Sequence, residues 1–249
     1  MPLQKRHKYI LISLAFYWPA IFVATHVSVP DGLVSSIAMS DKTMHFLMYL
    51  ALVSLVWLAV SPFEKVNWRK AKVWAILAVI VWYGVMDEWL QGFVGRDPDI
   101  MDFYTDISAA FAALLIFTFF RFWPAMLILA SVFMFAITCL TRVNIVFMHE
   151  LANSAFYFLS YSFFTLVWIQ CSERFWKLKK ATFRWFASSA GIPFIVLTAM
   201  VLASLAFGKR IWYMDIITAA AAISATTVIS YLTFAFSGKK QKTQSSRPV

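Results

Sequence analysis

Long apolar runs separated by short polar segments make up most of this chain. Each run is close to the roughly 20 residues that an α-helix needs to cross the hydrocarbon core of a bilayer. The runs lie at about 9–28, 44–61, 73–93, 104–122, 124–141, 151–171, 185–207 and 213–236. The pattern therefore predicts an all-α fold, a polytopic transmembrane helical bundle of about eight spans.

The segment that connects the fourth and fifth spans is the shortest of the connections. Only Arg121 to Pro124 separate them. A proline cannot continue a helix without losing a hydrogen bond and clashing with the preceding turn, so the sequence favours a tight hairpin here. One kinked helix over residues 104–141 is the alternative.

Composition supports the membrane interpretation. Hydrophobic residues make up 61% of the chain, charged residues only 14%, and the mean hydropathy is +0.73. Soluble domains average about 25% charged residues. A surface that faces lipid requires this excess of apolar side chains, because lipid offers polar groups no hydrogen bonds.

The basic residues are distributed unevenly between the two sets of loops. One set, which includes both termini, carries 17 of the 22 lysines and arginines, and the other set carries five. Loops rich in Lys and Arg face the cytoplasm. We therefore expect both termini in the cytoplasm and the chain in the plasma (inner) membrane. The net charge of +10 is then a topology signal and a contact for lipid head groups, and we expect no nucleic-acid binding.

Two pairs of segments suggest an internal repeat. GRDPDIMDFYTDISAA from Gly95 aligns with GKRIWYMDIITAAAAI from Gly208, and DKTMHFLMY from Asp41 resembles NSAFYFLSY from Asn153. The shifts are 113 and 112 residues, so we predict two parallel sets of four spans. A chance likeness between membrane helices is the alternative. The predicted parts are residues 1–122, residues 123–237 and a basic, disordered cytoplasmic tail over residues 238–249.

The second predicted half is less polar than the first. Tyr157 stands where the first half has His45, and Ala219 stands where it has Asp106. Ionisable groups inside a membrane span are costly and by default indicate function. The first half is therefore predicted to carry the site and the second to serve as scaffold.

The polar residues of the first half recur at helical spacing. Asp41, His45 and Tyr49 are four apart and share one face, while Glu88 and Gln91 are three apart. With the orientation above, these groups and those that follow them lie at the extracytoplasmic ends of three spans. We predict one shared ligand-binding site from Asp41, His45, Tyr49, Glu88, Gln91, Arg96, Asp102 and Asp106.

Single members of this set could instead have structural roles. Asp41 and Asp102 stand where they could cap helices. Arg96 could pair bidentately with Glu88 or Asp102, which would fix helix register. The same arginine, near a helix start, could instead bind an anionic head group.

These residues resemble the motif of the VanZ-like membrane family. Its pattern is Asp before His-Phe and Tyr, then Glu-x-x-Gln-x-Phe, then Arg, Asp, and Asn or Asp. The matching positions are Asp41, His45, Phe46, Tyr49, Glu88, Gln91, Phe93, Arg96, Asp102 and Asp106. The likeness covers roughly residues 36–121. It departs from the pattern in having Asp rather than the commoner Asn at 106, and alanine rather than glycine after the last motif.

The resemblance implies a membrane protein of the cell envelope. The family takes its name from a protein associated with resistance to the glycopeptide antibiotic teicoplanin, and most of its members have no assigned activity. The leading hypothesis is therefore a non-enzymatic protein that binds an anionic or lipid-linked envelope ligand, with a role in envelope homeostasis or glycopeptide resistance. It expects no cofactor and no metal.

Two other functions remain open. A membrane-embedded enzyme could use His45, Glu88 and Asp102 as candidate catalytic residues, acting as general acid and base on an envelope lipid. In a variant of that hypothesis, His45 and carboxylates hold a metal ion. A transporter ranks third, because two parallel halves suit alternating access but the polar groups all lie at one face.

Overall fold

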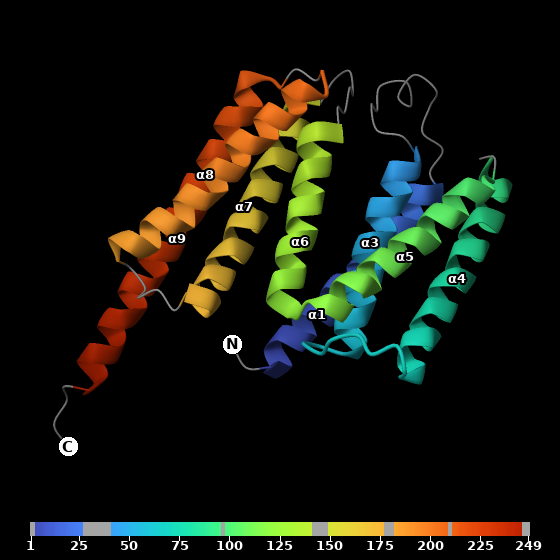
Figure 1. Cartoon of the computed structure of the whole chain (residues 1–249), viewed down its shortest axis with the longest axis horizontal. Helices are drawn as coiled ribbons and strands as arrows, with labels where there is room; N and C mark the ends of the chain where they lie inside the picture. The colour runs from blue at the N-terminus through green and yellow to red at the C-terminus, as the bar shows by residue number, and fades with distance from the viewer. Residues whose placement is uncertain are drawn as a thin grey trace. The chain divides into compact units, whose positions relative to one another are not determined.

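A computed structural model describes residues 3–26, 41–95, 98–140, 149–176, 182–208 and 211–245. These residues form helices and contain no β-strand (Figure 1). The helices are α1 (Leu3–His26), α3 (Asp41–Val60), α4 (Ala71–Gln91) with η1 (Gly92–Val94), α5 (Ile100–Phe119), α6 (Phe122–Phe135) with the π-helical η2 (Ala136–Leu140), α7 (His149–Trp176), α8 (Phe183–Ala206) and α9 (Tyr213–Ser245).

The predicted fold class is confirmed. Among the described residues, eight of the helical segments are long and apolar enough to cross a membrane. Their bounds differ from the predicted runs by a few residues, which is ordinary for helix ends. The chain is a multi-pass membrane protein.

The fourth and fifth spans are two helices and not one kinked helix. α5 ends at Phe119, and Phe120 is extended, with φ −114° and ψ 145°. Pro124 does not mark the break, because it lies inside the first turn of α6. A proline is tolerated there since the first N–H groups of a helix have no intrahelical partner to lose.

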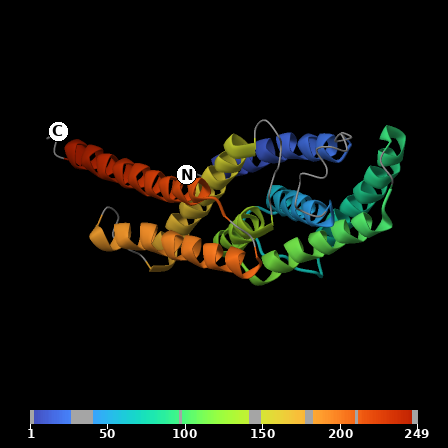
Figure 2. The same cartoon turned by 90° about the horizontal axis from the view of Figure 1, so that it is seen from above.

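The helices form two compact units, Met1–Ala125 and Met126–Val249. In the first unit α3 lies between α1 and α5, and α5 also packs on α4 (Figure 2). In the second unit α7, α8 and α9 all pack on one another. The predicted division into repeated halves at residues 122 and 123 stays a prediction.

Small residues bring the helices of the first unit together. Ala109, Ala110 and Ala113 of α5 are at most 1% exposed, and α5 makes its most extensive contacts with α3. Because lipid tails are as apolar as the side chains, no hydrophobic effect drives membrane helices together, and they associate through close packing of this kind. On the α4 side, a Cβ added at Gly84 would lie 3.3 Å from the Phe103 ring. The close approach of α3, α4 and α5 fixes the positions of the polar side chains at their ends.

Two local features recur at aligned positions, and the repeat itself stays a prediction. Gly95 and Gly208, which begin the two aligned segments, both have positive φ, at 79° and 70°. Glycine adopts that conformation without steric cost after a helix ends. The ring pair His45–Tyr49 stacks at 6.4 Å between centroids, and the aligned pair Tyr157–Tyr161 stacks at 6.2 Å.

The connection between α3 and α4 is basic and exposed. Glu64 Oε2 lies 2.9 Å from Lys72 Nζ and 3.8 Å from Lys70 Nζ. The nearby Lys72 ammonium holds the pKa of Glu64 below its usual range. Trp57, fully buried in α3, donates its indole N–H to the Glu64 carbonyl at 3.2 Å. This connection joins the ends of α3 and α4 that lie away from His45 and Glu88.

The C-terminal segment differs from the expected disordered tail. α9 continues past Gly238 as far as Ser245. The segment contains Lys and Gln, which have favourable helix propensity, and a helix that already exists extends without a new nucleation step. Residues 246–249 lie outside the described residues.

Candidate polar site in the first unit

The site lies where the first turns of α3 and α5 meet the last turns of α1 and α4. The start of α5 is set by Asp99, whose side chain accepts the Met101 N–H at 2.8 Å. Asp99 and not Asp102 is therefore the N-cap, and the capping role considered for Asp102 is wrong. Asp102 lies in the first helical turn, where its carboxylate faces the neighbouring helix.

A buried histidine–aspartate pair forms the centre of the site. His45 Nδ1 lies 3.1 Å from Asp106 Oδ1, and the two residues are 0% and 1% exposed. A carboxylate can only accept a hydrogen bond, so the ring donates through Nδ1–H, which leaves Nε2 as an acceptor when the ring is neutral. The pair therefore fixes both the tautomer and the orientation of His45.

Four buried polar atoms of this pair and its neighbours make no hydrogen bond of ordinary length within the described part of the chain. They are His45 Nε2, Tyr49 Oη, Glu88 Oε1 and Asp106 Oδ2. About nine in ten buried polar groups in proteins are partnered, because leaving one unsatisfied costs about 1–3 kcal/mol. Four such atoms on three neighbouring helices indicate a place where a ligand, an ion or water supplies the missing contacts.

A lysine neutralises the outer part of the site. Lys42 Nζ donates to Asp99 Oδ2 at 2.6 Å and to Asp102 Oδ1 at 3.3 Å. This ammonium holds the pKa of Asp99 below its ordinary value. The backbone N–H of Asp99 donates to Glu88 Oε2 at 2.9 Å, which connects the end of α4 to the start of α5.

α1 contributes a second polar group that the sequence did not place in the site. Thr25 donates to Asp87 Oδ1 at 2.9 Å, and His26 Nδ1 lies 3.6 Å from the same oxygen. Gln91 donates to Asp87 Oδ2 at 3.2 Å. The i, i+4 spacing of Asp87 and Gln91 was a usable signal. No sequence pattern linked Thr25 to either residue, because the contact spans 62 positions.

The structure brings most of the predicted site residues together. One ligand atom each of His45, Glu88 and Asp106 lie within 4.8 Å of one another, and the same holds for Asp41, His45 and Asp102. Tyr49 stacks on the His45 ring. Gln91 is connected to the site through its hydrogen bond to Asp87. Arg96 lies outside the described residues, so its predicted pairing with Glu88 or Asp102 stays a prediction.

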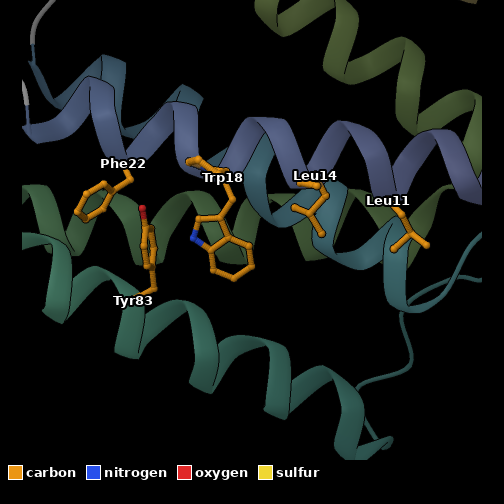
Figure 3. A pocket seen from close by; sticks show the side chains of 7 residues that line it. Leu11, Leu14, Trp18, Phe22 and Tyr83 are labelled. Atoms are coloured by element: carbon orange, nitrogen blue, oxygen red, sulfur yellow. The ribbon is translucent and has the colours of Figure 1, made fainter.

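An apolar groove lies beside the site, between α1 and α4 (Figure 3). Its volume is about 600 Å³, and Leu11, Leu14, Trp18 and Phe22 of α1 line it together with Tyr83 of α4. The Tyr83 ring packs edge-on against Trp18 at 5.4 Å and lies 5.9 Å from the Tyr49 ring. Tyr83 and Tyr49 therefore connect the groove to the buried pair.

Three positions of the second unit that align with site residues lie in an apolar cluster, while Asp215 aligns with Asp102. Tyr157, Tyr161 and Ala219 belong to a hydrophobic cluster there. Tyr161 shares a hydrogen bond with Thr138 at 3.2 Å. Within the described residues, the buried acidic groups all lie in the first unit. The scaffold role predicted for the second half stays a prediction.

The chain was compared with models of known families, with curated proteins and with solved structures, and none matches it. The interpretation of the site therefore depends on its own geometry and on the motif residues.

Proposed function

We propose that this multi-pass protein belongs to the VanZ-like family and binds a lipid-linked ligand of the cell envelope at the polar site. One observation carries the proposal. Four buried polar atoms that lack partners among the described residues lie next to an apolar groove of about 600 Å³. A ligand with a polar head and an apolar chain would occupy both.

The connection between groove and site favours a lipid over a small polar ligand. The chain of a lipid would lie along Leu14, Trp18 and Phe22, which Figure 3 shows on one side of α1 facing Tyr83. Its head would then meet Tyr49 and His45. For a chain that would otherwise be exposed to water, burying each methylene contributes about 0.8 kcal/mol to the free energy of binding. For a chain that would otherwise lie in lipid, the contribution comes from close packing against the groove.

The orientation of the site follows from the loop charges. The α3–α4 connection carries Lys65, Arg69 and Lys70 and belongs to the basic set of loops. The opposite ends of α3 and α4 carry the polar site, so the positive-inside rule supports an extracytoplasmic position for it.

Two sets of residues determine which kind of ligand head the site can accept. The described part of the site holds six acidic side chains against the one ammonium of Lys42: Asp41, Asp87, Glu88, Asp99, Asp102 and Asp106. An anionic head would depend on Arg96 for its contact. The acidic side chains would accept hydrogen bonds from hydroxyl or amino groups of the head.

Binding of a polyprenyl phosphate to the purified chain in nanodiscs tests the proposal. Arg96→Ala is expected to weaken binding about tenfold or more, since a hydrogen bond to a charged group contributes about 1.5–3 kcal/mol and 1.4 kcal/mol is a factor of ten. Native mass spectrometry or a fluorescent analogue gives the affinity.

Matched substitutions at the other end of the helices serve as controls. Arg69→Ala and Glu64→Gln change exposed residues of the α3–α4 connection and are expected to leave affinity unchanged. An affinity of Arg96→Ala equal to that of the wild type and of both controls would refute the binding site. A loss with the two controls as well would indicate non-specific attraction to charge.

The second candidate function is an enzyme at the same site. The observation that favours it is His45, which is oriented by Asp106 through Nδ1 and has its Nε2 unpartnered within the described residues. A histidine held this way is arranged to act as a general base. Incubation with the polyprenyl phosphate distinguishes the two functions, because only an enzyme would convert the lipid to a product of different mass.

A further inference from the structure

We propose that His45, Glu88 and Asp106 bind a divalent transition-metal ion. One ring nitrogen and two carboxylate oxygens from α3, α4 and α5 lie within 4.8 Å of one another. Ligand atoms around a tetrahedral zinc ion lie roughly 3.4 Å apart, given bond lengths of about 2.0–2.2 Å. Small rotations of three side chains would close the difference.

Charge supports this assignment. Glu88 and Asp106 are 9% and 1% exposed, and no lysine or arginine in the described ranges forms a salt bridge with either. Lys42, which enters the same region, pairs with Asp99 and Asp102. Buried carboxylates are costly unless they are paired, protonated or bound to a metal. A divalent cation would compensate both charges at once.

The unpartnered atoms are an independent indication. His45 Nε2, Glu88 Oε1 and Asp106 Oδ2 are all buried and lack hydrogen-bond partners within the described residues. The two carboxylates therefore have free lone pairs, and His45 would hold the ion through Nδ1, the ring nitrogen that faces Asp106, with its proton on Nε2. An acidic cluster held together only by internal hydrogen bonds would not leave these atoms unused.

A second set of residues could compete for an ion. Asp41, His45 and Asp102 also offer ligand atoms within 4.8 Å, but Asp41 is exposed and Asp102 already accepts from Lys42. The ammonium would repel a cation there. The set with Glu88 and Asp106 is wholly buried, and we assign the ion to it.

The ligand types indicate the class of metal. Imidazole suits Zn²⁺, Cu²⁺, Fe²⁺ and Ni²⁺, while carboxylates suit harder ions such as Mn²⁺. One imidazole with two carboxylates fits Zn²⁺ or Mn²⁺, and three protein ligands leave a position open. An anionic lipid head could take that position despite the acidic surroundings, a step that depends on the proposed function.

Metal content of the purified full-length chain tests the inference. The protein, freed of affinity tag and treated with EDTA, is incubated with ZnCl₂ or MnCl₂, desalted and measured by inductively coupled plasma mass spectrometry. We expect about one ion per chain in the wild type and in Glu64→Gln, and at least a tenfold lower content in Glu88→Gln and Asp106→Asn. These substitutions keep side-chain size, and circular dichroism checks folding.

The results separate the alternatives. Asp102→Asn is expected to keep its metal, and loss there with retention in Glu88→Gln would overturn the assignment in favour of the Asp41 set. A wild type without metal, or an unchanged Glu88→Gln, would overturn the inference altogether. The metal measurement is made without lipid, so the two proposals can fail separately. A protein that binds no metal but still binds polyprenyl phosphate would refute only the ion. A protein that binds metal but no lipid would refute only the proposed function.

Discussion

Replacing Asp106 by alanine is expected to lower the free energy of unfolding by about 1–3 kcal/mol relative to Asp106→Asn. Alanine leaves the buried His45 Nδ1–H without an acceptor, whereas asparagine keeps an oxygen in the place of Oδ1 and preserves the 3.1 Å hydrogen bond. Denaturation by sodium dodecyl sulfate in mixed micelles, followed by circular dichroism, measures the difference.

A control on the same helix separates this effect from general damage to α5. Ser108 is exposed and donates to the Tyr104 carbonyl at 2.8 Å, within its own helix. Ser108→Ala is expected to change stability by less than about 0.5 kcal/mol, as is usual at surface positions. If the alanine and asparagine variants of Asp106 have the same free energy of unfolding, the hydrogen bond between His45 and Asp106 does not stabilise the fold.

Enlarging Ala113 is expected to damage both stability and the site. Ala113 is 0% exposed on the face of α5 that packs inside the first unit. A leucine there overfills a packed interface, at a cost of about 1–3 kcal/mol, and forces α5 away from its neighbours. Because His45, Glu88 and Asp106 come from three helices, Ala113→Leu should also reduce Zn²⁺ content and polyprenyl phosphate affinity at least tenfold.

Ala78 on α4 provides the matched control. It is exposed, so Ala78→Leu adds the same atoms where nothing is displaced. We expect unchanged unfolding, metal content and lipid affinity. A similar loss in both alanine variants would mean that added bulk, and not helix spacing, causes the effect.

The spans were predictable because crossing a membrane constrains the sequence strongly. Every lipid-facing backbone group must form its hydrogen bond within its own helix, so each span is helical. The thickness of the hydrocarbon core then requires about 20 consecutive apolar residues for each span. The break between α5 and α6 lies at Phe120, a few residues before the predicted position. The prediction took Pro124 as the helix stop, but Pro124 lies in the first turn of α6. A proline alone does not distinguish the end of one helix from the start of the next.

The centre of the site was predictable from helical spacing. Asp41, His45 and Tyr49 share a face of α3, and the expectation that polar faces of three spans converge placed them near Glu88 and Asp106. Partners within the site were not predictable. Lys42 and Asp99 stand on different elements, and their contact depends on how closely α3 and α5 approach each other.

The contribution of α1 could not be inferred at all. Thr25 is a common residue near a helix end, and His26 had no fixed neighbour in the sequence. Their contacts with Asp87 arise because α1 runs along α3 and reaches the end of α4. Contacts of this kind follow from the packing of helices and leave no periodic signal.

A double-mutant cycle between His45 and Asp106 tests most directly whether these side chains form one site. Unfolding is measured for wild type, His45→Phe, Asp106→Ala and the double variant, and a second cycle pairs His45→Phe with Glu64→Gln. We predict a coupling free energy of about 0.5–3 kcal/mol for the first pair and additivity within about 0.5 kcal/mol for the second. Additivity in the His45–Asp106 cycle would contradict the shared site.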